Sequence, residues 1–514
     1  MQDEITLTVV HWPGDAPLAE VVGSVRSVGA QQGVTWDLCV PSTALEACDG
    51  LPEGTVHALD VAEPTKAAVY AAGLERATGE WTVFLDQNVR LEPGALRAIV
   101  DAMLRPGPVD VVYGDEIREA DGDRRRLRRP VWSPERALGE LYTGRLLAVR
   151  TALGREVGAF GADSVGAEEH DLLLRAVAHG AQPAHVAVPL CLAPPPVDAP
   201  EAPGTRGERA RTAAQRVVQQ HLDRHRPGTR AVPSRSPAAL TLVRPELADA
   251  LVSIVIPTRG GRALVWGEDR VLVVETVRSV VRHGGLARFE VVVVHDDVTP
   301  EPVLDELRAL CGDRLVLVPF SGPFNFSAKC NAGYVASAGE IVLMLNDDVD
   351  VRSPGALARL VAPLDRPEVG MTGARLLYSD GTVQHGGHVY ARGAMTHAFL
   401  GASPDDPAIP ELHVDRETSG LTAACVALRR EVFETVGGFS EALPVNFNDV
   451  DLSYKVRWLG LSLLWVATAD LYHFESRTRV PVVHPWEAST VHARWHGEGD
   501  DPYLPEHRYP GPSS

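Results

Sequence analysis

Apolar and amphipathic segments alternate along the second half of the chain. The apolar segments, which are short enough to be strands, are 251–258, 289–297, 314–320 and 340–348. The segments between them, near 270–283, 300–310 and 327–338, have the periodicity of amphipathic helices. This alternation predicts a mainly parallel sheet flanked by helices on both faces, with ligands at the carboxyl ends of the strands.

The first half repeats this pattern imperfectly. ERATGEWTVFLDQNVRLEPGAL at 75–96 parallels YVASAGEIVLMLNDDVDVRSPGAL at 334–357. EEHDLLLRAVAHG at 168–180 parallels NDVDLSYKVRWLG at 448–460. Such self-similarity indicates one architecture used twice. We therefore predict an α/β protein with two tandem domains of the same kind.

A change in composition separates the two halves. Residues 196–247 are rich in proline and arginine and contain one helical stretch, 208–226, which is typical of a linker. We predict a first domain at 1–195, a second at 248–500 and a tail at 501–514. A chain of 514 residues is also too long for a single core.

The charge and the cysteines restrict the functional classes to which the protein could belong. A formal charge of −19 argues against non-specific nucleic-acid binding, which depends on Lys and Arg. Six scattered cysteines without C-x-x-C spacing favour neither a zinc site nor a disulfide framework. The N-terminus is acidic, and no apolar run reaches the roughly 18 residues of a spanning helix. We expect a cytoplasmic protein whose membrane contact, if any, is peripheral at the inner face.

Three motifs carry candidate chemistry. LMLNDDVDV at 343–351, VNFNDVDL at 445–452 and LYHFES at 471–476 each lie where an apolar strand gives way to a loop. Carboxylates and an imidazole should therefore meet at one edge of the sheet. Such a set suits a divalent cation and an anionic leaving group.

Two other nucleotide-binding classes fit the sequence poorly. A Rossmann oxidoreductase would carry Gly-x-Gly-x-x-Gly after the first strand, where this chain has IPTRGGRAL. A sugar-1-phosphate nucleotidyltransferase would carry a Gly-rich, Arg-containing loop there, and RGGR resembles such a loop only weakly.

A family resemblance rests on motifs spread over 251–505. VSIVIPTRG, PFNFSAKCNAGYVASAGEIVLMLNDDVDV, VQHGGHVY, LTAACVALRREVFETVGGF, VNFNDVDLSYKVRWLG, LYHFESRTR and DPYLPEHR occur in that order. Together they resemble a family 2 glycosyltransferase of GT-A fold, of the bacterial rhamnosyltransferase-like kind that builds surface polysaccharide. The first half resembles the domain often fused to such enzymes. The resemblance implies two tandem GT-A-like domains.

The resemblance implies a Mg²⁺ or Mn²⁺ cofactor. Asn346, Asp347 and Asp348 occupy the family's Asp-x-Asp position, with Asn replacing the first Asp. We assign Asp348 as a metal ligand and Asn346 as a contact to ribose or to metal-bound water. His473 matches the family's late metal-binding histidine. The alternatives are a solvated acidic turn and a plain hydrogen-bonding histidine.

The resemblance also implies a catalytic base. Inverting transfer needs a carboxylate that takes the proton of the acceptor hydroxyl, and Asp449 matches the family's base. Asp451 reads more simply as a helix N-cap. The residues expected to support the acceptor side are Gly437, Gly438, Asn448, Asp451 and Glu475.

The donor nucleotide is expected near the first two strands. The implied donor-binding residues are Pro257, Thr258, His295, Asp296, Lys329, Asn331, Asn346 and Asp347. His295 stands where the family usually has an Asp that holds the base, so the base stays open. Lys329 can also be read as a solvated surface residue. Trp458 and Trp465 are expected to pack in the core.

The first half departs further from the family. Its acidic cluster begins with Asp86, its base position is Glu169, Ala71 replaces Asn331, and no late histidine follows. We expect this domain to be weak or inactive and to bind acceptor glycan or brace the second domain. The alternative is a second active transferase that uses Asp86 and Glu169.

One basic run stands out, and it includes Arg124, Arg125, Arg126, Arg128 and Arg129. A solvated loop is the default interpretation. The alternative is docking to a lipid-linked acceptor or an anionic membrane.

Three function hypotheses remain. The leading one is an inverting transferase that moves a sugar, with dTDP-rhamnose among the candidate donors, to a growing polysaccharide or lipid-linked glycan. The second keeps both domains active. The third is a carbohydrate-binding scaffold without turnover.

Overall fold

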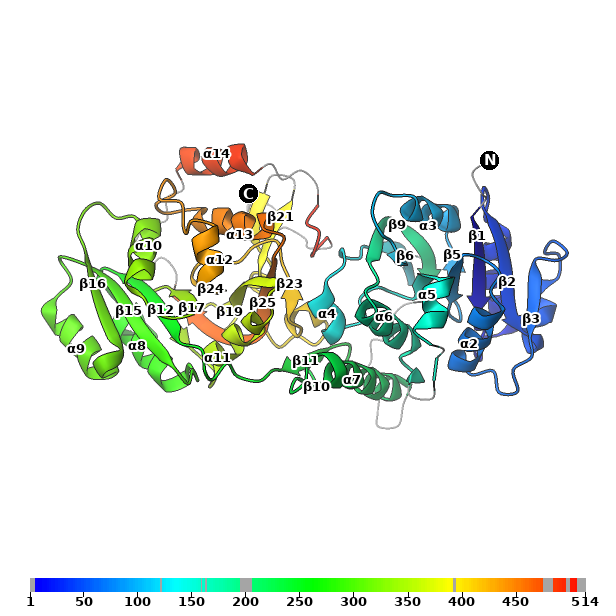
Figure 1. Ribbon diagram of the computed structural model, residues 1–514, viewed down its shortest axis with the longest axis horizontal. Coiled ribbons are helices and arrows are strands. Elements are labelled where there is room, and N and C mark those ends of the chain that lie inside the picture. The colour runs from blue at the N-terminus through cyan, green and yellow to red at the C-terminus, as the bar shows by residue number, and fades with distance from the viewer. Residues whose placement is uncertain are drawn as a thin grey trace. The chain divides into compact units, whose positions relative to one another are not determined.

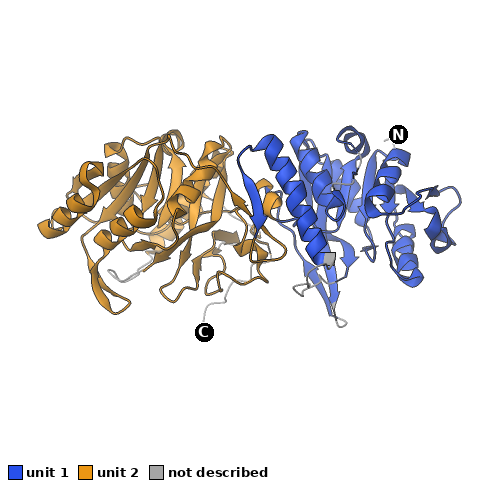
Figure 2. Cartoon of the chain, turned by 90° about the horizontal axis from the view of Figure 1, so that it is seen from below, with its two compact units in different colours: residues 1–133, 140–233 blue, residues 134–139, 234–514 orange. Residues whose placement is uncertain are grey.

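Two units, each with its own sheet, make up the chain (Figure 2). Unit 1 comprises residues 1–133 and 140–233, and unit 2 comprises 134–139 and 234–514. The computed structural model describes residues 5–505, except 121–122, 159, 162–163, 195–205, 392–393, 475–483 and 496–499. The border at 233/234 falls inside the predicted linker.

The sheet of unit 2 begins with parallel strands and ends in mixed ones. In spatial order it contains β16 (Leu315–Phe320), β15 (Phe289–Asp296), β12 (Val252–Thr258), β17 (Ile341–Leu345), β24 (Cys425–Arg429), β19 (Val369–Leu377), β25 (Ser462–His473) and β18 (Val349–Val351). The first four are parallel, β24 is antiparallel to both neighbours, and β18 runs antiparallel to β25. The expectation of a mainly parallel sheet therefore holds for the first four strands, and the other half is mixed.

Two short strands extend this sheet, β20 (Val383–His385) on β19 and β23 (Arg416–Glu417) on β25. Two hairpins form two-stranded sheets of their own, β13 (Arg262–Val265) with β14 (Glu268–Val271), and β21 (His388–Ala391) with β22 (Ala394–His397). Strand β11 (Leu240–Val243) also belongs to this unit.

Helices cover both faces of the unit 2 sheet (Figure 1). One face packs against α8 (Leu272–His283), α9 (Glu301–Cys311) and α11 (Ala356–Val361). The other packs against α10 (Phe326–Ala336), α12 (Arg430–Thr435) and α13 (Asn448–Trp458). The unit also holds α4 (Pro134–Gly139) and α14 (Pro485–Arg494). Two apolar layers explain why the parallel strands are continuously hydrophobic.

Unit 1 has a sheet of the same kind. Its path is β3 (Val56–Leu59), β2 (Thr35–Pro41), β1 (Thr6–His11), β4 (Trp81–Leu85), β8 (Leu146–Arg150), β6 (Val111–Ala120), β9 (Pro183–Ala193) and β5 (Arg90–Leu91), with β7 (Asp123–Leu127) on β6. The remaining elements are α1 (Leu18–Gly29), α2 (Lys66–Arg76), α3 (Ala95–Met103), α5 (Thr151–Glu156), α6 (Glu168–Ala178), α7 (Arg206–His225) and β10 (Arg230–Pro233). The helix predicted in the linker is α7.

Equivalent contacts in the two units support the internal repeat. A Cβ atom added to Gly73 of α2 would lie 2.3 Å from Val10, and one added to Gly333 of α10 would lie 2.4 Å from Val255. Each glycine thus lets its helix approach the first strand of its sheet closely. The prediction of two tandem α/β domains of the same kind is confirmed.

Side-chain burial corrects one core prediction. Trp465 is fully buried as expected, but Trp458 at the end of α13 is 82% exposed, so its assignment to the core is wrong. The helical period turns position 458 outward, away from the sheet that buries Leu452 and Val456.

The cysteines and the apolar character of the helices say little about the function. All six cysteines are buried and form no disulfide. Within the described residues, no helix combines the length and the apolar character needed to cross a bilayer.

Candidate active site

A cavity of about 540 Å³ opens in unit 2 at the carboxyl ends of β12 and β17. Eight of the predicted site residues line it: Pro257, Thr258, Asn346, Asp347, Asp348, Asn448, Asp449 and His473. They come from segments far apart in sequence, and the open α/β sheet brings them to one edge.

Strand pairing places His473 beside the acidic loop. The antiparallel register of β18 and β25 sets Val349 opposite His473, and the N–H of Phe474 donates to the carbonyl of Asp348 at 2.9 Å. As a result, Nε2 of His473 lies 3.2 Å from Oδ1 of Asp348. The acidic loop and the late histidine therefore form one group.

Gln384 orients the His473 ring. Its Oε1 accepts a hydrogen bond from Nδ1 of His473 at 2.7 Å. Because an amide oxygen only accepts, Nδ1 carries the proton and Nε2 keeps its lone pair toward Asp348. A histidine held in this way through its other nitrogen is typical of metal ligands.

The residues present fit a divalent cation. Asn346 Oδ1 is buried and accepts no hydrogen bond among the described residues. The Asn346 side chain reaches the same group, since its Nδ2 lies 3.2 Å from His473 Nε2, which itself lies 3.2 Å from Asp348 Oδ1. Carboxylate and amide oxygens suit Mg²⁺ and Mn²⁺, and an imidazole favours Mn²⁺ over Mg²⁺.

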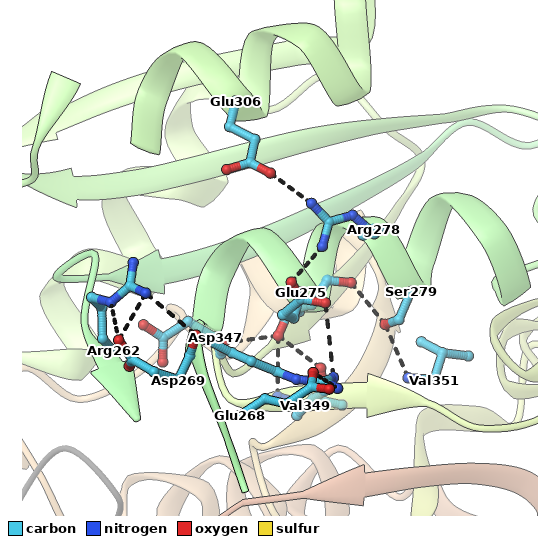
Figure 3. A network of polar contacts seen from close by, with 12 residues as sticks. Arg262, Glu268, Asp269, Glu275, Arg278, Ser279, Glu306, Asp347, Val349 and Val351 are labelled. Carbon is cyan, nitrogen blue, oxygen red and sulfur yellow. Dashed lines mark hydrogen bonds and ion pairs between the residues drawn. The ribbon is translucent and has the colours of Figure 1, made fainter. Parts of the chain in front are cut away.

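Helix α8 supports the acidic loop from behind. The hydroxyl of Thr276 lies within hydrogen-bond distance of the carbonyls of Asp347 (2.8 Å) and Val349 (2.7 Å), and it accepts from the N–H of Val349 at 3.1 Å. Ser279, one turn later, accepts from the N–H of Val351 at 3.0 Å. Figure 3 shows these loop residues against the helix. Two hydroxyls thus hold the backbone between the acidic cluster and β18.

Asp347 turns toward the first strand. The hydroxyl of Thr258 donates to its Oδ2 at 2.6 Å. Burial, and then the neighbouring charge of Asp348, raise the pKa of Asp347 to about 7. Crowding of two carboxylates is a cause of this kind of shift, and a bound cation would relieve it.

Asp449 lies in the first turn of α13, where the helix N-terminus favours a carboxylate. Its oxygens accept hydrogen bonds from the N–H groups of Ala423 at 3.3 Å and Val450 at 2.8 Å. Burial nevertheless raises the pKa of Asp449 above its ordinary value. A carboxylate with a raised pKa at the wall of a cavity suits proton transfer.

Four predicted donor residues lie outside the cavity lining. Lys329 is fully buried, pairs with Asp296, and donates to the carbonyl of Thr258 at 2.7 Å. The alternative interpretation of Lys329 as a solvated lysine is therefore wrong. Asn331 donates to the carbonyl of Phe439 at 3.0 Å and accepts from its N–H at 3.0 Å. His295 ends β15 next to Asp296.

The supporting residues divide into two kinds. Asn448 lines the cavity, while Gly437 and Gly438 form a turn with φ of +71° and +65° beside Asn331.

Asp451 does not cap α13, whose N-cap position is Phe447. It is buried inside the first turn and accepts from Nε1 of Trp495 at 2.9 Å. The capping interpretation is thus wrong, and Glu475 lies outside the described residues.

Other residues of the cavity were not predicted from the sequence. Gln384, His388 and His397 line the cavity, but no role was assigned to them. The first two lie in VQHGGHVY, a motif that carried the resemblance, so that motif was the available signal. Their importance depends on contacts with distant segments, which no local pattern encodes.

Unit 1 has a different arrangement at the equivalent position. Nζ of Lys66 lies 2.5 Å from Glu169 and 3.3 Å from Asp86. Burial alone would lower the pKa of Lys66, but Glu169 and Asp86 raise it above the ordinary value. The two carboxylates that could hold a cation are therefore already paired with an ammonium group.

The arginine run also has partners inside unit 1. Arg126 and Arg129 pair with the buried carboxylates of Asp115 and Glu116 at 2.6 and 2.8 Å. Arg124 pairs with Glu92 at 2.7 Å. These pairs give three of the five arginines a structural role, and docking to a membrane stays a prediction.

Comparisons with known proteins bear on unit 2 most directly. Residues 250–497 match the sequence model of the family described as "Glycosyltransferase like family 2". The crystal structure of GalNAc-T7 with UDP, GalNAc and Mn²⁺ shares a TM-score of 0.39 and 17% identity over 49% of each chain, and no argument rests on that likeness.

Curated relatives from three organisms match the chain. The uncharacterized protein y4gI of Sinorhizobium fredii is 32% identical over 91% of this chain and 53% of its own length. The O-antigen biosynthesis protein RfbC of Myxococcus xanthus is 30% identical over 98% of this chain and 40% of its own length. An N-acetylglucosaminyl-diphospho-decaprenol L-rhamnosyltransferase of Mycobacterium tuberculosis is 29% identical over 28% of this chain and 50% of its own. The chain spans about half, or less, of the length of these relatives.

The family match and the cavity coincide, because every residue that lines the cavity lies within the matched segment. Residues 250–497, just under half of the chain, thus match glycosyltransferase family 2.

Proposed function

We propose that unit 2 is a metal-dependent inverting glycosyltransferase. It takes a sugar from a nucleotide-diphosphate donor and transfers it to a surface polysaccharide or a lipid-linked glycan. The observation that carries the proposal is the meeting of Asp348, His473 and Asp449 around one cavity. A cation site and a carboxylate base that line one cavity are what a single displacement requires.

The donor side is built from the acidic loop. Asp348, His473 and Asn346 would hold the cation, which supplies positive charge to the departing diphosphate when it is bound. Thr258 fixes Asp347 beneath this site through a 2.6 Å hydrogen bond. Lys329 acts indirectly, by holding the end of β12 through the Thr258 carbonyl.

The acceptor side is built around Asp449. The acceptor hydroxyl attacks the anomeric carbon from the face opposite the diphosphate, and its proton passes to the Asp449 carboxylate. A new C–O bond forms as the bond to the diphosphate breaks, so the anomeric configuration inverts. The raised pKa of Asp449 makes it a better proton acceptor than an ordinary aspartate.

The name of one relative supports rhamnose as the sugar. That relative is called an L-rhamnosyltransferase, but it matches only 28% of this chain. The relative named for O-antigen biosynthesis supports a polysaccharide acceptor and matches 98% of the chain. We therefore rank dTDP-rhamnose first among the donors to test.

The test is donor turnover by the full chain. Donor hydrolysis and transfer are measured over a panel of nucleotide sugars with Mn²⁺, Mg²⁺ or EDTA, for wild type, Asp348→Ala and the control Asp350→Asn. Asp350 lies two residues further on and does not line the cavity. We expect one donor to turn over in a metal-dependent way, with loss in Asp348→Ala alone. No turnover with any donor or metal would favour the scaffold hypothesis.

Unit 1 is proposed to serve a binding or bracing role. The ammonium group of Lys66 between Asp86 and Glu169 argues against a second metal-dependent transferase there. The peripheral membrane contact is tested separately, by liposome binding that disappears as the salt concentration rises.

A further inference from the structure

Three imidazoles gather at the wall of the unit 2 cavity, apart from His473. They belong to His385, His388 and His397, and one ring nitrogen of each lies within 4.8 Å of the others. The Nδ1 atoms of His385 and His397 are 2.8 Å apart. Two of the three, His388 and His397, line the cavity.

The backbone builds this cluster from three short strands. The register of the β21–β22 hairpin sets His388 directly opposite His397. Gly386 and Gly387 then turn the chain so that His385, at the end of β20, reaches the same point. Gly387 has a φ of +92°, and a Cβ atom there would lie 2.5 Å from the Thr418 hydroxyl. The turn therefore requires glycine.

The imidazoles are suited to bind a cation rather than to carry charge. Burial lowers the pKa of His388 and of His397 to about 3, and it also lowers the pKa of His385. A neutral imidazole keeps one lone pair, which is the form that binds metals. Three neutral imidazole nitrogens that lie within 4.8 Å of one another are costly to bury unless each has a hydrogen-bond partner or a metal ion.

Outer contacts leave donor atoms facing inward. Nδ1 of His388 lies 3.2 Å from the Tyr390 hydroxyl, so a proton donated to that oxygen leaves Nε2 for an ion. The backbone of His385 is held by Trp465, whose Nε1–H donates to its carbonyl at 3.3 Å. His385 and His397 share one proton between their Nδ1 atoms. A metal bound to both atoms would replace this proton, which would move to Nε2 of His385. Nε2 could then no longer accept the 3.4 Å hydrogen bond from the N–H of Thr422.

We propose that His385, His388 and His397 bind one divalent transition metal of the Zn²⁺ class. Three imidazoles without a carboxylate select Zn²⁺, Co²⁺ or Ni²⁺ over Mg²⁺, unlike the oxygen-rich group at Asp348. A site with three histidines keeps a fourth position for water or substrate. Two of the three histidines, His388 and His397, line the cavity. The proposal does not depend on the proposed function.

The test uses Co²⁺ as a visible probe in the full chain. Asp348→Ala removes the first site, so Co²⁺ binding to this variant reports the histidine site alone. We expect one equivalent to bind with the strong visible absorption of four-coordinate Co²⁺, and Zn²⁺ to displace it. Absence of that binding in the folded Asp348→Ala protein would overturn the proposal.

Histidine variants then locate the site. His388→Gln and His397→Gln, each combined with Asp348→Ala, should weaken binding more than about 100-fold, beyond what loss of an outer-shell contact produces. The control is His413→Gln, since His413 is buried in the same unit but its ring bonds only to the carbonyl of Asp406 in the described contacts. Binding that survives in the folded cluster variants, or that falls equally in the control, would place the ion elsewhere. Circular dichroism checks the folding of each variant.

Discussion

At the scale of single residues, the candidate site depends on how each polar group is held. His473 faces Asp348 because Gln384 occupies its other nitrogen. Asp449 combines the first turn of a helix with burial that raises its pKa. Three residue-scale predictions follow from these contacts.

Asp449→Asn tests the base. Removing the proton acceptor should lower kcat about 10²- to 10⁴-fold, because that is the usual contribution of general base catalysis. Donor affinity should stay within about twofold, since the variant keeps the shape of the side chain. Steady-state kinetics and calorimetric donor binding measure the two effects. Unchanged product formation would remove Asp449 from the mechanism.

The pH profile tests the same residue in wild type. The base must be ionised, and burial raises the pKa of Asp449, so it stays protonated to higher pH than an ordinary aspartate. We expect kcat/KM at saturating metal to fall on acidification, with an acid limb above the pKa of about 3.9 of a free aspartate. A profile flat down to that value would contradict the assignment.

Gln384→Leu tests the orientation of His473. Losing the acceptor for Nδ1–H should weaken Mn²⁺ binding about 10- to 100-fold, as outer-shell changes usually do. Gln384→Glu keeps an acceptor oxygen and should restore the affinity. The Mn²⁺ dependence of turnover measures both variants. Equal losses in the two would indicate a packing effect instead.

At the scale of elements, α8 supports the acidic loop and β18. The hydroxyls of Thr276 and Ser279 take the polar role that a further strand would otherwise fill, because the backbone N–H groups of Val349 and Val351 donate to them. Buried backbone groups need such partners. The position of Asp348 is thus set partly by a helix that precedes it by some seventy residues, as the separation of Thr276 from Val349 is 73.

Thr276→Val tests this support. The change keeps the shape but leaves the buried N–H of Val349 without its acceptor, which costs about 1–3 kcal/mol. We expect the free energy of unfolding, measured in urea, to fall by this amount, and metal-dependent turnover to weaken. Thr435→Val is the control, because among the described residues its hydroxyl bonds only to the carbonyl of Glu431 in its own helix. A similar loss in the control would show that the effect is not specific to the loop.

At the scale of the whole molecule, two related units have diverged. Both carry an acidic cluster after a buried strand and a carboxylate at the start of a later helix. In unit 1 Lys66 joins the two carboxylates, whereas the unit 2 cavity presents Asp348 and Asp449 separately. The same architecture thus holds a paired, self-contained charge cluster in one unit and an open site in the other.

Glu169→Gln tests where transfer occurs. We expect unchanged sugar transfer, although breaking the buried pair with Lys66 should destabilise unit 1 by about 3 kcal/mol. Activity is measured below the unfolding temperature, which calorimetry defines for each variant. A loss of transfer as large as that in Asp449→Asn would mean that unit 1 is the catalytic unit or a second one.

Local patterns in the sequence were enough to predict the strands, the helices, the repeat and the acidic cluster. The reason is that a helix or strand with a buried face carries hydrophobic residues at a regular spacing. The expected helix at 327–338, for example, is α10 at Phe326–Ala336. The orientation of His473 by Gln384, the burial of Lys329, the exposure of Trp458 and the gathering of three histidines were decided only by the tertiary structure. Each of these depends on which distant segments meet, and hydrophobic periodicity says which face of an element is buried but not what lies against it.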